Sequence, residues 1–299
     1  MLGKLTKNAF KSNAAGIYNI YIAEGIITIV MLILLLVDWT KWGDTGVGLG
    51  LAIKCIASVA LCITAAIGIV MTFVSVFSDF KRNMYGIEGH LTLSLPVRGS
   101  SLLFAKWLSG AFWVILSYLV FCLAAGGSAL YIFRHSMSIV EGDAAYSSIY
   151  QVATEMIRQL CDSAGIVTPS ARVLGYVVAM YAFDGGIRAC SFVLLVFFAI
   201  TLAHCRPFNK LGKLGAVLYF FAGTFITQTF ASMITKLVKI YVVVSDTAFT
   251  FTLSEAEVKA AWQMGFGAYS MTNLYCTVVM TVAVFLVTAY LIDRKVNAE

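Results

Sequence analysis

Long runs of apolar residues divide this chain, and its charged residues gather in the stretches between them. A helix that rises about 1.5 Å per residue needs about 20 residues to cross the hydrocarbon core of a bilayer. Runs of that length cover residues 17–37, 49–77, 102–133, 174–203, 214–234 and 274–292. They are apolar on all faces, whereas the strands of a membrane barrel alternate apolar and polar positions. We therefore predict an all-α, polytopic membrane protein with about six transmembrane helices in a single transmembrane domain, 1–299.

Composition supports this class and excludes a water-soluble one. Of the 299 residues, 60% are hydrophobic and 12% are charged, and the mean hydropathy is +0.88. A soluble domain carries about 25% charged residues, which keep its surface hydrated. The net charge of +6 does not indicate a nucleic-acid partner. The basic residues form no stripe with interleaved aromatic residues, and they lie in clusters beside the apolar runs.

The basic residues also predict how the chain is oriented in the membrane. Twelve of them fall in the N-terminal segment, the regions after the second and fourth runs, and the C-terminal tail: Lys4, Lys7, Lys11, Lys81, Arg82, Arg98, Lys106, Arg206, Lys210, Lys213, Arg294 and Lys295. The other loops hold seven. Because basic residues accumulate on the cytoplasmic side, we predict that both termini are cytoplasmic. Residues 1–16 could form a short amphipathic helix in the interface or an ordinary cationic tail.

The two long outer loops, 134–173 and 235–273, are predicted to contain packed helices. Residues 146–161 are helix-like, and residues 254–262 are a stronger helix candidate. In the second segment, Ser254 is a predicted N-cap with Glu257 at its third position, the pattern of a capping box. The neighbouring aromatic residues Trp262, Phe266 and Tyr269 are expected at the membrane interface.

Motifs for catalysis or metal binding do not occur in this sequence. It has no phosphate-binding G-x-x-x-x-G-K-[ST] loop, no dinucleotide fingerprint after a strand, and no H-E-x-x-H or G-x-S-x-G pattern. The seven cysteines have no C-x-x-C spacing, and the three histidines fall in separate loops. We therefore predict no metal site, no cofactor in this chain and no enzymatic activity. Any energy for transport has to come from a partner or an ion gradient.

The segment after the second apolar run carries a resemblance to a known family. Residues 79–97 read DFKRNMYGIEGHLTLSLPV. This resembles an E-G-Y-L-T-L-T-L-P-V run between the second and third spans of type-2 ATP-binding cassette (ABC) exporter permeases, especially those of Gram-positive bacteria. A lysine that opens the third span of those proteins corresponds to Lys106, and the first residues, MLGKL, also look alike. The detailed likeness covers about 40 residues, and His90 departs from it because a tyrosine is usual there.

The resemblance implies a permease that works as a dimer with two copies of a separate ABC ATPase, which binds ATP and magnesium. Residues 78–100 would then form a cytoplasmic coupling segment seated in a groove of the ATPase. The residues expected at this contact are Tyr85, Glu88, Gly89, His90 and Pro96. The implied function is export of hydrophobic or amphipathic cargo, such as a peptide antibiotic, a drug or a lipid-like molecule, across the bacterial plasma membrane. The second permease is an identical chain or a paralogue, and an ordinary polar loop is the alternative for 78–100.

Three ionisable residues inside the apolar runs form a second candidate site. A charge at the centre of a bilayer costs roughly 2.5–3.5 kcal/mol on insertion scales, so each one needs a partner or a role. Asp184 precedes Arg188 by four residues, the favourable order for an ion pair on one helix. Glu24 and Arg188 are expected at similar depth. We predict a polar cluster of Glu24, Asp184 and Arg188, which is structural, sensitive to cargo or conformation, or part of a solvated cavity lining.

Two other functions remain open from the sequence. The first is an ion-coupled secondary transporter with Glu24 and Asp184 as proton carriers. Such transporters often contain inverted repeats, and residues 1–135 and 174–299 show no convincing similarity to each other. The second is a non-transporting immunity or sensor subunit that binds a peptide through its outer loops.

Overall fold

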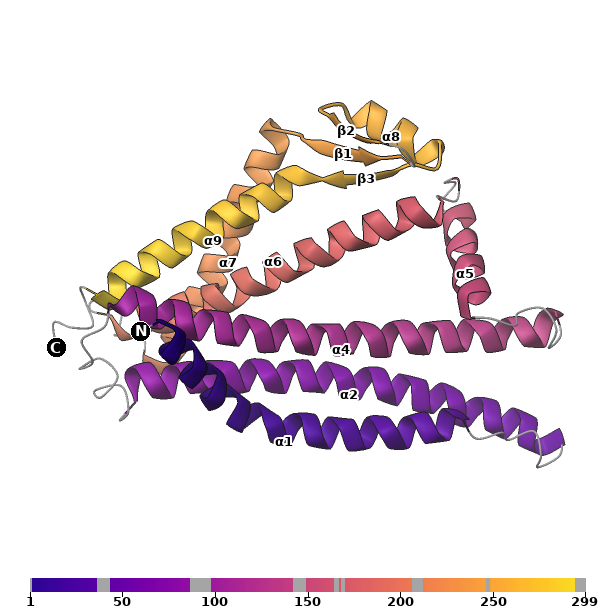
Figure 1. Cartoon of the computed structure of the whole chain (residues 1–299), viewed down its shortest axis with the longest axis horizontal. Coiled ribbons are helices and arrows are strands. Elements are labelled where there is room, and N and C mark those ends of the chain that lie inside the picture. The colour runs from indigo at the N-terminus through magenta and orange to yellow at the C-terminus, as the bar shows by residue number, and fades with distance from the viewer. Residues whose placement is uncertain are drawn as a thin grey trace. The chain divides into compact units, whose positions relative to one another are not determined.

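The computed structural model describes residues 2–36, 44–86, 98–141, 149–163, 167, 170–205, 212–245 and 248–293. The helices are α1 (Leu2–Leu36), α2 (Asp44–Tyr85), α4 (Gly99–Glu141), α5 (Ile149–Ser163), α6 (Ala171–His204), α7 (Gly212–Leu237), α8 (Glu255–Gln263) and α9 (Met271–Leu291) (Figure 1). The strands are β1 (Tyr241–Val244), β2 (Phe249–Thr252) and β3 (Gly267–Ser270). Six helices, α1, α2, α4, α6, α7 and α9, are long and apolar enough to cross a membrane. This confirms the prediction of a mainly helical, polytopic protein.

Several helices extend beyond the apolar runs that predict them. The lysine-bearing residues before position 17 belong to α1, so this segment continues the first span as helix. α2 continues to Tyr85, and α4 begins at Gly99. The helical conformation of α2 stops at Gly86, where a Cβ atom would lie 2.4 Å from the carbonyl oxygen of Arg82. A glycine therefore suits the point where the chain leaves this helix.

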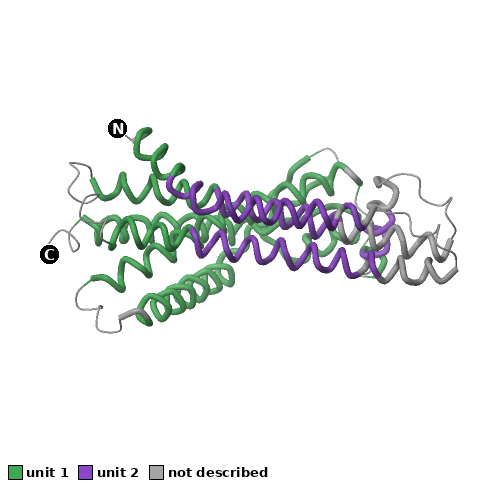
Figure 2. The backbone as a smooth tube through the Cα atoms, turned by 90° about the horizontal axis from the view of Figure 1, so that it is seen from below, with its two compact units in different colours: residues 1–11, 76–112, 161–299 green, residues 12–75, 113–160 purple. Residues whose placement is uncertain are grey.

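The chain divides into two compact units (Figure 2). Unit 2, residues 12–75 and 113–160, contains the larger parts of α1, α2 and α4. Hydroxyl groups join these three helices. The hydroxyls of Tyr21 and Ser117 are 2.6 Å apart, and Ser117 donates a hydrogen bond to Thr72 over 2.9 Å. Small residues also allow close approach, since a Cβ atom at Gly16 would lie 2.7 Å from Oγ of Ser75.

Unit 1, residues 1–11, 76–112 and 161–299, is organised around α6. This helix packs against α7, α9 and the strands β1 and β3. Within the apolar window of α6, 44% of the residues are buried, whereas most residues of α7 are exposed or half-buried. In unit 1, α6 is therefore the core helix, and α7 lies at its periphery with one side against α6 and α9.

A small subdomain in unit 1 connects α7 to α9. Its strands form an antiparallel sheet in the order β2-β1-β3, built from β-branched and aromatic residues such as Val243 and Phe251. Helix α8 covers a core of Val243, Ala261 and Ala268, against which Trp262 and Phe266 also pack. The all-α prediction missed this sheet, because four-residue strands are too short to stand out within an apolar loop.

Two details of this subdomain differ from the sequence predictions. The predicted helix at 254–262 forms as α8, but the side chain of Ser254 makes no capping hydrogen bond. Instead, the hydroxyl of Thr252 accepts from the backbone N–H of Ser254 and donates to Glu257. Tyr269 was expected at the membrane interface, yet it is only 4% exposed and packs edge-on against Tyr181. Packing of β3 against α6 therefore replaces the expected surface position.

Replacing Gly267 by alanine is expected to lower the free energy of unfolding by about 1–3 kcal/mol, because it overpacks the contact between β3 and α6. A Cβ atom there would lie 2.2 Å from Cγ2 of Val177 and 3.2 Å from Cγ1 of Val173. Unfolding in mixed detergent micelles measures the change. Gly175→Ala is the matched control, since no atom of the described residues lies within 4 Å of the position that its Cβ atom would take. Adding Val177→Ala to the Gly267→Ala variant should restore its stability. If Gly267→Ala alone is as stable as wild type, the close contact between β3 and α6 is contradicted.

Candidate functional site

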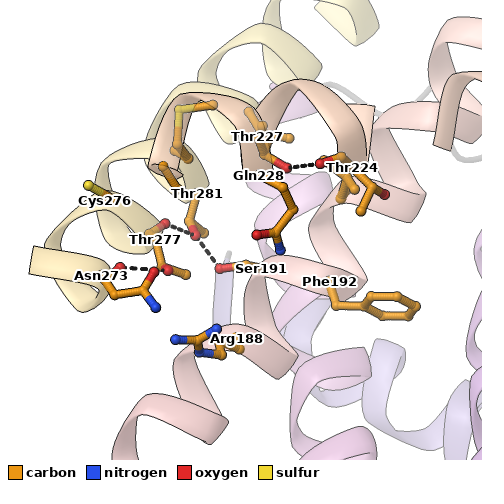
Figure 3. Close-up of a pocket in the computed structure, with 14 residues that line it drawn as sticks. Arg188, Ser191, Phe192, Thr224, Thr227, Gln228, Asn273, Cys276, Thr277 and Thr281 are labelled. Carbon is orange, nitrogen blue, oxygen red and sulfur yellow. Dashed lines mark hydrogen bonds between the residues drawn. The ribbon is translucent and has the colours of Figure 1, made fainter. Parts of the chain in front are cut away.

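A polar cavity of about 220 Å³ lies between α6, α7 and α9 in unit 1 (Figure 3). More than half of its 14 lining residues have polar side chains, although all three helices are apolar enough to span a membrane. These polar residues are Arg188 and Ser191 on α6, Thr224, Thr227 and Gln228 on α7, and Asn273, Thr277 and Thr281 on α9. Polar groups at membrane depth are costly, so their convergence on one cavity marks a candidate site for function.

The threonine hydroxyls of the cavity donate to their own helices. Thr224 donates to the carbonyl of Phe220 over 2.7 Å, and Thr277 donates to that of Asn273 over 2.9 Å. A Ser or Thr hydroxyl has one proton and two lone pairs. Because the proton is already used, these oxygen atoms are available to a ligand mainly as acceptors. A hydrogen bond between the hydroxyls of Ser191 and Thr281 joins α6 to α9 at the same cavity.

Arg188 is the one cationic residue among the described residues that line the cavity. Its Nε donates to Oδ2 of Asp184 over 2.7 Å. Asp184 is buried, whereas 45% of the Arg188 side chain is exposed. The structure thus places these two predicted site residues together as an i,i+4 pair. Asp184 orients the guanidinium group without lining the cavity itself.

Glu24, the third member of the predicted cluster, belongs to unit 2. Its carboxylate packs over Gly68, where a Cβ atom would lie 2.5 Å from Oε2 of Glu24. The absence of a side chain at Gly68 therefore makes room for this carboxylate between α1 and α2. A contact of Glu24 with Asp184 and Arg188 stays a prediction.

Tyr269 connects the small subdomain to the ion pair on α6. Burial, together with the negative charge of Asp184, raises the pKa of Tyr269 to about 12. Its hydroxyl is therefore neutral at physiological pH and adds no second negative charge beside Asp184. Sequence reasoning did not connect these two residues, because nothing in the sequence predicts that β3 packs on α6.

A buried ion pair flanks the predicted coupling segment. Nζ of Lys106, near the start of α4, lies 2.7 Å from Oδ2 of Asp79, near the end of α2, and both residues are buried. Asn83 donates a hydrogen bond to the other carboxylate oxygen over 3.0 Å. From the sequence, Lys106 is an orientation charge and the lysine of the family resemblance, and its pairing with Asp79 was not predicted. The sequence signal that could have predicted the pair is an acidic residue at the end of one span and a lysine at the start of the next.

Aromatic contacts fix the end of α2 to α6. The rings of Phe80 and Phe197 stack with their centroids 3.8 Å apart and an interplanar angle of 6°. The hydroxyl of Tyr85 donates to Thr201 over 2.9 Å, and its ring stacks on His204 at 4.3 Å. Tyr85 was predicted at the ATPase contact, and here it anchors the start of the segment to α6. Glu88, Gly89, His90 and Pro96 lie outside the described residues.

Other kinds of site find no support in the described part of the chain. It contains no group of three or more His, Cys, Asp or Glu side chains that could hold a metal ion. A scan against protein-family models and searches of curated proteins and of solved structures find no match to this chain. The resemblance to ABC permeases therefore stays a prediction from the sequence.

Proposed function

We propose that this chain is the membrane-spanning permease subunit of an ATP-driven ABC exporter in the bacterial plasma membrane, with both termini in the cytoplasm. The observation that carries the proposal is how the described residues on both sides of 87–97 are held. The residues on both sides of 87–97 are joined by the Asp79–Lys106 pair, and the end of α2 is packed on α6. The same helix α6 contributes Arg188 and Ser191 to the polar cavity.

These contacts provide a mechanical route from the segment to the cavity. Phe197, which stacks on Phe80, follows Arg188 by nine residues on α6, a distance of roughly 14 Å along the helix. A continuous helix moves largely as a rigid body over that distance. A push on the coupling segment would therefore shift the cavity wall that Arg188 and Ser191 form, relative to α7 and α9.

The energy and the partners of this mechanism lie outside the chain. The sequence has no nucleotide-binding motif, so a separate ABC ATPase would bind ATP and magnesium. Two permeases, identical or paralogous, would work with two ATPase copies. The cavity combines polar and apolar side chains, which is consistent with hydrophobic or amphipathic cargo.

A proton-coupled secondary transporter is the main alternative. It would use Glu24 and Asp184 as proton carriers. Asp184, however, is held in an ion pair with Arg188 and does not line the cavity. A proton carrier needs access to the transport path, so the geometry favours the exporter. An immunity or sensor subunit is the remaining alternative, and ATPase dependence separates it from the exporter.

The test is affinity purification of the tagged chain from native membranes in mild detergent, with mass spectrometry and an ATPase assay of the eluate. We expect an ABC ATPase to copurify with the chain in stoichiometric amount. The double variant Glu88→Ala/Gly89→Arg should no longer copurify it. Glu255→Ala is the control, because Glu255 is exposed in the predicted outer subdomain. Recovery of intact chain without an ATPase, under conditions that preserve a known ABC complex, contradicts the proposal.

A further inference from the structure

The cavity between α6, α7 and α9 offers a specific set of ligand contacts. Arg188 has five N–H donors, and the hydrogen bond that the structure gives it runs from Nε to Asp184. The terminal nitrogens therefore have donors for a ligand. The amide of Gln228 extends from α7 toward the side of the cavity that Ser191 and Arg188 form (Figure 3). None of the described residues that line the cavity is acidic.

This arrangement selects an anionic oxygen. A carboxylate or phosphate accepts charge-assisted hydrogen bonds from a guanidinium group, which are shorter and stronger than bonds between neutral groups. Gln228 and Asn273 add neutral amide donors at the same cavity. The threonine oxygens, whose protons are bonded to helix carbonyls, accept from hydroxyl or amine groups of the ligand. Among the described residues of this lining, a simple cation has no acidic partner.

The apolar part of the lining indicates that the ligand is an amphipath. Phe192 and Leu195 of α6 and Met280 and Val284 of α9 line the cavity together with the polar groups. Large apolar side chains of α7, including Phe221, Phe225 and Ile226, are exposed in unit 1. An acyl or other apolar tail could remain against these surfaces while the polar head occupies the cavity.

We infer that this cavity binds the anionic head group, a carboxylate or phosphate, of an amphipathic molecule, with Arg188 holding the anion. The inference specifies the head-group chemistry of the cargo and, for its role in export, rests on the proposed function. Binding itself requires no ATPase. The site can therefore be tested on the purified full-length chain, separately from the exporter complex.

The experiment measures binding of radiolabelled laurate and dodecyl phosphate to the tagged chain in dodecyl maltoside, a neutral detergent with the same tail length. We expect saturable binding of at least one anionic probe, competed by its unlabelled form and not by dodecyltrimethylammonium. Arg188→Gln should weaken this binding at least about tenfold, as expected for loss of a hydrogen bond to a charged group. The preferred probe distinguishes a carboxylate-bearing ligand from a phosphate-bearing one.

Matched variants separate the site from general effects on the helices. Arg172→Gln removes an exposed arginine from the same helix and should change affinity by less than about twofold. Gln228→Leu should weaken binding by about fivefold, whereas Ser232→Ala, one turn further along α7, should have little effect. Because Arg188→Gln leaves Asp184 buried without its cation, the double variant Asp184→Asn/Arg188→Gln serves as a second test. It removes both charges and should also lose binding.

The outcomes separate this inference from the exporter proposal. Anion binding that depends on Arg188 supports the inference even if affinity purification recovers no ATPase. Recovery of the ATPase without such binding supports the exporter and overturns the inference. Unchanged anion binding by the double variant, or equal competition by the cationic amphipath, also overturns it.

Discussion

Replacing Lys106 by methionine is expected to lower the free energy of unfolding by about 3–5 kcal/mol, the usual cost of leaving one member of a buried ion pair without its partner. Lys106 and Asp79 are both buried, and their charged atoms are 2.7 Å apart. Methionine keeps most of the length of the lysine side chain, so lost packing contributes little. The carboxylate of Asp79 would keep its hydrogen bond from Asn83 but lose its nearest cation. Unfolding in mixed micelles, followed by circular dichroism, measures the change.

Arg82→Met is the matched control for this experiment. Arg82 lies 3.8 Å from the same carboxylate, but its side chain is 64% exposed. An exposed ion pair contributes about 0–1 kcal/mol, so this variant should remain close to wild type. The double variant Asp79→Asn/Lys106→Met removes both buried charges and should recover part of the loss. If Lys106→Met costs no more than Arg82→Met, the buried pair does not stabilise this part of the fold.

The features that depend on local sequence were predictable. The six long helices follow from apolar runs of spanning length, because a helix satisfies its backbone hydrogen bonds within lipid without help from the rest of the chain. The Asp184–Arg188 pair follows from its i,i+4 spacing on one of these helices. Helix α8 follows from a helix-forming segment between loop residues. In each case, residues within a few turns of one another determine the structure.

The features that depend on contacts between distant segments were not predictable. Asp79 and Lys106 are 27 positions apart, and Phe80 and Phe197 are much further apart in sequence. The cavity combines residues from three helices, and each helix alone contributes ordinary Ser, Thr, Asn or Gln side chains. Without the packing of α6 against α7 and α9, nothing in the sequence groups Gln228 and Asn273 with Arg188. The small sheet was missed for the same reason, since its strands exist only by pairing with one another.

Phe197→Ala is expected to have a similarly large effect, about 3–5 kcal/mol of unfolding free energy, because it leaves a cavity at a junction of three helices. Phe197 is 1% exposed, stacks on Phe80 and meets the edge of Phe77 on α2. On α4, Gly110 approaches closely enough that a Cβ atom there would lie 3.6 Å from Cζ of Phe197. Lipid cannot fill a gap enclosed on these sides, so the lost packing is not replaced.

Phe183→Ala on the same helix is the control, because Phe183 is exposed in unit 1 and should change stability by no more than about 0.5 kcal/mol. Phe197→Leu retains much of the side-chain volume and should lose less stability than Phe197→Ala.

The Phe197→Leu variant also tests the mechanical route from the coupling segment to the cavity. If the chain is the proposed permease and the Phe80–Phe197 contact transmits force from the predicted coupling segment to α6, the Leu variant should still bind the proposed ATPase but transport less cargo per ATP hydrolysed. Wild-type coupling in a folded Phe197→Leu variant would place the route through the Asp79–Lys106 pair and α4 instead.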